Sequence, residues 1–225
     1  MKKLYAILLL VGLMVSSLDT LAAPKQPQVI DFTQNTPNIY GDVARTADFR
    51  VRLLLPPYNI NMPVPAFSQN DLSWKNDLMK TENQTIGNAG CALTSSTMVA
   101  AYYGKNTTPK IFNIDMGNYA CPLYWTEVAG RGGSGYISGI NTLINNPSLN
   151  TFFSYAQVAM EQNKPVVLGF VQTNGRTHYV VVKAVYGQGT SLMDYGCIDP
   201  NTGTYRNLVD VVGSQPLYKL VIYNR

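Results

Sequence analysis

The chain has 225 residues, of which 46% are hydrophobic, 11% aromatic and only 13% charged. This composition is typical of a globular protein with a hydrophobic core, and it excludes a disordered or collagen-like chain. The formal net charge is +4 and the basic residues are scattered, which argues against a nucleic-acid partner. A single histidine and three cysteines are too few for a typical zinc site, so a metal enzyme is not expected.

The first 22 residues are typical of a secretory signal peptide. Lys2 and Lys3 precede an apolar run from Leu4 to Val15, and small residues follow at Thr20 and Ala22. The apolar run is too short to cross the roughly 30 Å hydrocarbon core of a bilayer, which disfavours a membrane anchor. We therefore expect cleavage after Ala22 and an exported protein, periplasmic or extracellular, with no transmembrane segment left after cleavage.

Residues 23–63 are expected to form an N-terminal arm that packs onto the domain. The arm is rich in Pro, Asn, Thr and Gln, and the apolar run Phe49–Leu55 within it favours a strand that ends at Pro56. The domain itself is expected over residues 64–225. The arm has two interpretations, as an inhibitory propeptide or as a structural part of the mature protein.

Three helices are predicted after the arm. The first begins at Cys91 and extends over Ala92–Tyr103, with Gly104 where a C-terminal cap belongs. Two shorter helices are predicted over Tyr136–Ile144 and Phe152–Gln162. The thiol of Cys91 is thereby expected at a helix N-terminus.

Beyond Pro165 the pattern changes to that of β-strands. Strands are predicted over Val166–Val171, His178–Val185, Leu192–Ile198 and Leu217–Tyr223. Asn174-Gly175 is a strong signal for a tight hairpin between the first two strands, which makes them antiparallel. The sequence thus predicts an α+β fold, in which an N-terminal helical part packs on a C-terminal antiparallel sheet.

The lone histidine and a later aspartate are expected to meet across two strands. If the turn after the His178 strand is centred on residues 188–189, His178 lies directly opposite Asp199. Such partners lie about 5 Å apart at Cβ, close enough for a carboxylate to hold an imidazole N–H. The residues that share the histidine's face are apolar, so a helix should cover this face. The helix that begins at Cys91 is the best candidate.

A cysteine, a histidine and an aspartate in this arrangement favour acyl transfer. A helix N-terminus and an adjacent imidazolium both stabilise a thiolate at Cys91. His178 would accept the thiol proton and later donate it to the leaving amine, while Asp199 would fix the histidine tautomer. The backbone N–H of Cys91 and the side-chain amide of Gln69 are the expected donors to the developing oxyanion.

Each of these residues also has a purely structural interpretation. Cys91 would then be a small buried apolar residue and His178 a hydrogen-bonded core histidine. Asp199, before a proline, would be a turn residue, and Gln69 an ordinary loop glutamine. The other two cysteines, Cys121 and Cys197, are candidates for a disulfide that leaves Cys91 free, because an oxidising compartment favours pairing.

Five segments occur in a fixed order along the chain: Val64–Asp71 (VPAFSQND), Thr85–Gly87 (TIG), Gly90–Met98 (GCALTSSTM), His178–Val182 (HYVVV) and Ile198–Pro200 (IDP). Together they resemble the papain-like cysteine peptidases of the bacteriocin-processing, double-glycine-peptidase-like family. The resemblance covers roughly Val64 to Asn224 and implies a papain-like fold, a peptide or protein substrate and no cofactor.

The resemblance also assigns a role to each candidate residue. It implies that Gln69 belongs to the oxyanion hole, Cys91 is the nucleophile, His178 is the base and Asp199 orients the histidine. The bacteriocin-processing members are usually cytosolic domains fused to a transporter and cleave after a double glycine. This chain begins with a predicted leader instead, so their substrate is not carried over.

The sequence therefore predicts an exported cysteine peptidase that hydrolyses peptide or related amide bonds through a thioester. Three alternatives stay open: another acyl transfer on the same fold, such as transpeptidation, deamidation or cell-wall-stem hydrolysis; an inactive binding module; and an effector that acts on another cell's protein. Residues 111–135, which include Cys121, Tyr124, Trp125 and a glycine cluster, match no motif and are expected to shape the substrate groove.

Overall fold

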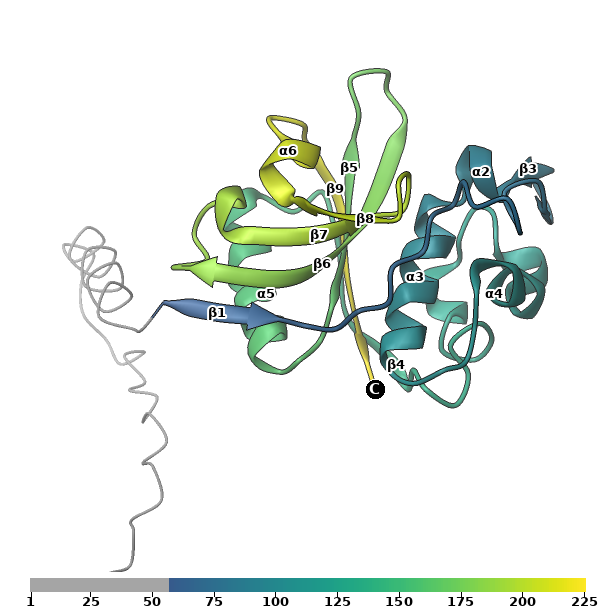
Figure 1. Ribbon diagram of the computed structural model, residues 1–225, viewed down its shortest axis with the longest axis horizontal. Helices are drawn as coiled ribbons and strands as arrows, with labels where there is room; N and C mark the ends of the chain where they lie inside the picture. The colour runs from purple at the N-terminus through teal and green to yellow at the C-terminus, as the bar shows by residue number, and fades with distance from the viewer. Residues whose placement is uncertain (1–56) are drawn as a thin grey trace, which may run out of the picture. The chain divides into compact units, whose positions relative to one another are not determined.

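The computed structural model describes residues 57–225 (Figure 1). The elements, in chain order, are β1 (Tyr58–Asn61), β2 (Leu78–Met79), β3 (Gln84–Thr85), α2 (Ile86–Ala89), α3 (Cys91–Tyr102), α4 (Pro109–Met116), the 3-10 helices η1 (Gly117–Tyr119) and η2 (Trp125–Glu127), β4 (Gly139–Asn145), α5 (Leu149–Glu161), β5 (Val166–Val171), β6 (Thr177–Gly187), the 3-10 helix η3 (Leu192–Asp194), β7 (Tyr195–Asp199), β8 (Thr204–Asn207), α6 (Leu208–Val212) and β9 (Leu217–Asn224). The signal peptide predicted over residues 1–22, the strand predicted at Phe49–Leu55 and most of the arm lie outside the described residues.

One antiparallel sheet organises the described part of the chain. Its strand order is β4-β9-β5-β6-β7-β8, and β1 also pairs with β6. Strand β5 pairs with residues Thr177–Val182 of β6, and β1 pairs with the following residues Ala184–Gly187. Tyr58–Asn61, which fall within the segment predicted to be the arm, therefore extend the sheet beside β5.

The β5–β6 hairpin forms as its turn residues predict. Gly175 has a φ of 79°, which few residues other than glycine adopt readily. The side chain of Asn174 accepts a hydrogen bond from the backbone N–H of Arg176 at 2.9 Å. All residues of β5 except Val171 are buried, which explains its continuous apolar run.

Helices α3, α5 and α6 lie against this sheet, whereas α2 and α4 pack on α3 and form a group with it (Figure 1). Helix α3 packs on β6 and β5, and α5 packs on β6 and β9. Residues Leu93–Ala100 of α3 are all buried. The histidine-bearing face of β6 is thus covered by the helix that begins at Cys91, as the sequence predicted.

Two predicted elements are wrong. Tyr136–Ile144 is not a helix: residues Gly139–Asn145 form strand β4, which pairs with β9 along the sheet edge. Its partly buried and exposed residues mostly alternate, as expected of an edge strand, and edge pairing outweighs the weak local helical pattern. The strand predicted from Leu192 begins only at Tyr195, because Ser191 caps the 3-10 turn η3 by accepting a hydrogen bond from the N–H of Met193.

The predicted pairing of His178 with Asp199 is wrong by two residues. Val181 pairs with Ile198 and Val182 with Cys197, so the register continues to Asp199 opposite Val180. Two features together produce this shift: the 3-10 turn lengthens the connection, and the register changes by one residue between Val182 and Ala184. Because side chains alternate with a period of two, a two-residue shift keeps His178 and Asp199 on the same face as diagonal neighbours.

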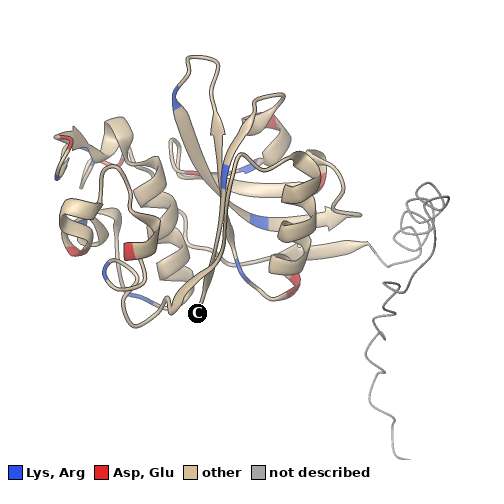
Figure 2. Cartoon of the chain, turned by 180° about the vertical axis from the view of Figure 1, so that it is seen from behind, with Lys and Arg blue, Asp and Glu red and all other residues tan. Residues whose placement is uncertain are grey.

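Charged residues are spread over the helices and the sheet without a stripe of one sign (Figure 2). No helix within residues 57–225 is long and apolar enough to cross a membrane.

Candidate active site

Cys91 is the first residue of α3 and follows directly on the short helix α2. Thr85 caps α2 by accepting a hydrogen bond from the backbone N–H of Asn88. Gly90 joins the two helices so closely that a Cβ there would overlap the carbonyl of Ile86, and only glycine fits. This corner fixes Cys91 at the helix N-terminus, with 8% of the residue exposed.

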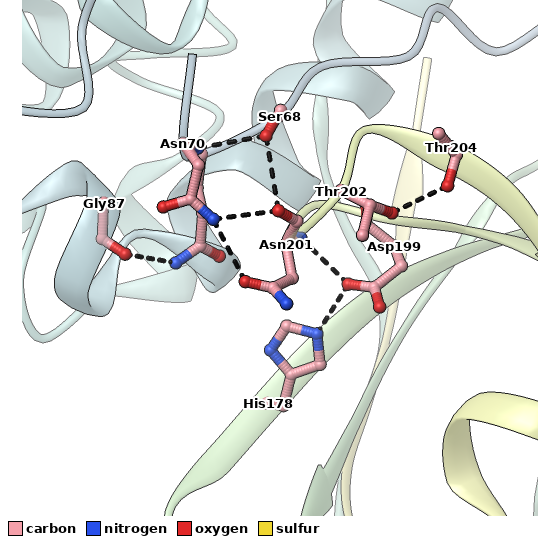
Figure 3. A network of polar contacts seen from close by, with 9 residues as sticks. Ser68, Asn70, Gly87, His178, Asp199, Asn201, Thr202 and Thr204 are labelled. Carbon is pink, nitrogen blue, oxygen red and sulfur yellow. Dashed lines mark hydrogen bonds and ion pairs between the residues drawn. The ribbon is translucent and has the colours of Figure 1, made fainter. Parts of the chain in front are cut away.

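His178 and Asp199 form a direct buried contact (Figure 3). The imidazole Nε2 lies 2.8 Å from Oδ1 of Asp199. The ring also packs edge-on against Phe170 of β5, with 5.6 Å between ring centroids. Since Nε2 is engaged by the carboxylate, Nδ1 is the ring nitrogen left for Cys91.

The charges around the imidazole favour its protonated form. Burial lowers the pKa of His178, but hydrogen bonds to Asp199 and Cys91 and the negative charges of these two groups outweigh it, and the pKa rises to about 9. Burial raises the pKa of the Asp199 carboxyl. The hydrogen bond with His178, a second from the backbone N–H of Asn201 and nearby positive charge together hold that pKa below its usual value. An imidazolium–carboxylate pair is therefore the stable state near neutral pH.

Gln69 lies buried in the loop between β1 and β2, with only 6% exposure. Its Nε2 donates a hydrogen bond to the carbonyl of Gly87 at 2.8 Å. Its Oε1 is buried and has no hydrogen-bond partner among the described residues. Because the Gly87 carbonyl can only accept, this bond fixes which end of the amide is the NH₂ group, and it leaves one further N–H available for a ligand.

The loop of Gln69 is fastened to the turn that follows Asp199 (Figure 3). The backbone N–H of Gln69 donates to the carbonyl of Pro200 at 2.7 Å. The side chain of Asn70 donates to the carbonyl of Asn201 at 2.8 Å, and the N–H of Asn201 donates to Oδ1 of Asp199 at 2.9 Å. A continuous set of hydrogen bonds therefore links the glutamine loop to the histidine's carboxylate.

A glycine permits the close approach of these two segments. Gly203 has a φ of 69°, and a Cβ at this position would lie 2.9 Å from the backbone nitrogen of Ser68. A larger residue would force the glutamine loop away from the Asp199 turn.

Three of the four predicted site residues line one cleft of about 980 Å³: Gln69, Cys91 and His178. Asp199 lies behind His178 and does not line it. Residues Ala120–Thr126 form part of the wall, so the segment that matched no motif does border the groove. Trp125 there packs on Tyr179, with 5.1 Å between ring centroids, and the cleft has an aromatic side.

The disulfide predicted between Cys121 and Cys197 is not formed, and all three cysteines are free. Cys197 is fully buried on the interior strand β7, where burial raises the pKa of its thiol to about 12. Cys121 donates a hydrogen bond to the carboxylate of Glu82 at 3.5 Å; burial and this acidic neighbour raise its pKa to about 11. The two thiols thus have different surroundings, and neither is activated as a nucleophile.

Within residues 57–225, no group of three or more His, Cys, Asp or Glu side chains could hold a metal ion.

Sequence reasoning missed the residues that join the two halves of the site. Asn70 and Asn201 lie in polar loops, where asparagine is ordinary turn chemistry, so nothing in the sequence distinguishes them. Arg176 also escaped notice: it follows the Asn-Gly turn and reaches the cleft rim. Its position only two residues before the lone histidine was the one available signal.

The model of the Peptidase_C39 like family matches residues 62–215, a range that contains all four predicted site residues. No curated protein and no solved structure gives a significant match.

Proposed function

The chain belongs to the Peptidase_C39 like family, and we propose that it is an active cysteine peptidase that hydrolyses peptide bonds with Cys91, His178, Asp199 and Gln69. Membership of this family supports a papain-like cysteine peptidase in general. The observation that carries the specific proposal is the buried contact of 2.8 Å between His178 and Asp199. His178 lines the same cleft as Cys91, which lies at a helix N-terminus, so the oriented imidazole can serve this thiol.

In the first half of the proposed reaction, the Cys91 thiolate attacks the carbonyl carbon of the substrate. The carbonyl oxygen becomes an oxyanion, which the backbone N–H of Cys91 and the free N–H of Gln69 stabilise. When the tetrahedral intermediate collapses, the C–N bond breaks and His178 donates its proton to the leaving amine. A thioester to Cys91 remains and the amine product departs.

In the second half, water attacks the thioester. His178 now accepts a proton from the water, the C–S bond breaks, and a carboxylic acid product leaves. Asp199 stays ionised throughout, holding the imidazole through Nε2 and stabilising its charged form. The bond from the Asn201 N–H keeps this carboxylate in place.

A digest of peptides from an unrelated proteome, incubated in ¹⁸O-labelled water and analysed by mass spectrometry, tests this proposal. Hydrolysis predicts new C-termini that carry one ¹⁸O atom in the wild-type protein and none above background in Cys91→Ala. Ligated products without label would instead indicate transpeptidation, the principal alternative on the same fold. A wild-type protein that yields neither product would contradict the proposed activity.

We also propose export of the mature protein, because residues 1–22 have the pattern of a signal peptide. The N-terminal sequence of the protein recovered outside the cytoplasm tests this: a start at Ala23 is expected, and an intact N-terminus retained in the cytoplasm would contradict it.

A further inference from the structure

Arg176 reaches across the cleft from the sheet side to the helical side. It lies at the end of the β5–β6 hairpin, two residues before His178, and lines the cleft. Its Nη2 donates a hydrogen bond to the backbone carbonyl of Asn88 at 2.7 Å. Asn88 precedes Cys91 by three residues and lines the same cleft. The guanidinium is therefore held on the wall of the cleft that also contains Cys91 and His178.

This guanidinium has unused hydrogen-bonding capacity. An arginine carries five N–H donors in a planar fork that matches a carboxylate, and one contact to a carbonyl occupies few of them. No carboxylate of residues 57–225 forms an ion pair with Arg176, which is itself exposed. An exposed arginine fixed by one backbone bond, with its charge unpaired within this part of the chain, is suited to bind an anion.

The other charged residues of the cleft are less suited to this role. Glu82 accepts the hydrogen bond from the thiol of Cys121. Lys219 also forms no ion pair within residues 57–225, but it donates to the side chain of Asn145 at 2.5 Å, lies 5.5 Å from the centre of the Tyr218 ring and lacks the planar fork of an arginine. The cleft thus has an aromatic side near Trp125 and two cations, Arg176 and Lys219. The aromatic side and the cations suit different parts of a bound peptide.

We propose that Arg176 binds a carboxylate of the substrate next to the bond that is cleaved. The substrate class is then peptides with an Asp or Glu side chain, or a free C-terminal carboxylate, within about two residues of the scissile bond, because Arg176 is bonded to a residue only three positions before Cys91. The inference rests on the proposed function, because it concerns the substrate of the same cleft.

Cleavage profiles of a peptide digest test this directly. Wild type should cleave preferentially where a carboxylate lies within two residues of the bond, and Arg176→Gln should lose the preference about threefold to tenfold. Arg176→Lys should retain part of it, and Lys110→Gln, which removes an exposed positive charge on α4, should retain all of it. C-terminal amidation of the same peptides separates the two carboxylate sources, because it removes only the terminal one. A wild-type profile without acidic preference, or one unchanged in Arg176→Gln, overturns the inference.

A second measurement needs no turnover and separates this inference from the proposed function. The rates at which Cys91 reacts with anionic iodoacetate and with neutral, nearly isosteric iodoacetamide are compared in each variant. The imidazolium of His178 attracts iodoacetate in all variants, so a change in the rate ratio reports Arg176 alone. The ratio should fall about threefold in Arg176→Gln and stay constant in Lys110→Gln. If the wild type cleaves no peptide but the rate ratio falls in Arg176→Gln, the peptidase proposal fails and the carboxylate site stands. A rate ratio that is unchanged in Arg176→Gln overturns the carboxylate site. Circular dichroism of each variant confirms folding.

Discussion

The side-chain amide of Asn70 donates a hydrogen bond to the backbone carbonyl of Asn201 at 2.8 Å. A second contact joins the same amide to Oδ1 of Asn201 at 3.1 Å. Asn70 follows Gln69, and the N–H of Asn201 holds the carboxylate of Asp199. One exposed side chain therefore connects the loop of the proposed oxyanion donor with the turn that orients the histidine.

Replacement of Asn70 by Ala should lower kcat about tenfold and change KM little. The loop of Gln69 and the turn of Asp199 would lose their fixed relative position, while the cleft stays open to substrate. Steady-state kinetics on a peptide identified in the digest measures both constants. Asn76→Ala, an exposed asparagine in the same β1–β2 loop, is the matched control. Equal kinetics in the two variants would show that Asn70 has no positioning role.

Replacement of Gln69 by Ala should reduce kcat by about 10²- to 10³-fold, the usual effect of removing one oxyanion donor. Alkylation of Cys91 passes through no oxyanion, so its rate should change far less than turnover does. Comparison of the two rates in one preparation therefore separates loss of an oxyanion donor from general damage to the site. Gln162→Ala, at the end of α5 and outside the cleft, serves as control. A parallel loss of both rates in Gln69→Ala would contradict the assigned role.

The single histidine of the chain makes its titration directly measurable by NMR in untagged protein. The resonance should titrate near pH 9, since Asp199 and Cys91 raise the pKa of His178 above its ordinary value of 6.5. Asp199→Asn removes the negative charge and replaces the carboxylate by a weaker, neutral amide acceptor, so the pKa of His178 should move down. The limb in which activity falls with rising pH should shift in the same direction. A wild-type titration near 6.5 would contradict this description of the site.

The two remaining thiols should differ in their effect on stability. Cys197 is fully buried on β7, so Cys197→Ser places a hydroxyl in the core and should lower the free energy of unfolding by about 1–3 kcal/mol. Cys121→Ser should cost less, because the new hydroxyl can donate to Glu82 as the thiol does. Urea denaturation measures both values. Alkylation of the unfolded protein without reductant should modify all three cysteines; a single modification would instead indicate a disulfide.

The sequence was sufficient for the parts of the fold with strong local signals. The Asn174-Gly175 turn specified the β5–β6 hairpin, and the continuous apolar run of β5 reflects burial on both faces of the sheet. The juxtaposition of His178 and Asp199 was predicted although the register was wrong, because a two-residue shift preserves the face of a strand. A one-residue error would have separated them.

The parts that failed depend on contacts distant in sequence. Residues 139–145 became a strand because β9, about 80 residues later, offers an edge with which to pair. The bond between Asn70 and Asn201 likewise spans more than half of the described chain, and neither residue carries a local signal. The position of Arg176 beside Asn88 follows from the packing of the helices on the sheet, which no local pattern specifies.

The most direct test of the central claim is the rate of Cys91 alkylation at neutral pH, followed by intact mass in the wild-type protein, Cys91→Ala and His178→Ala. The site described above predicts rapid addition of one iodoacetamide group to the wild type. It predicts loss of this fast reaction in Cys91→Ala and strong slowing in His178→Ala, because the imidazolium stabilises the reactive thiolate. Slow labelling of the wild type that His178→Ala leaves unchanged would mean an inert thiol, and would contradict the assignment of Cys91 and His178 as a catalytic pair.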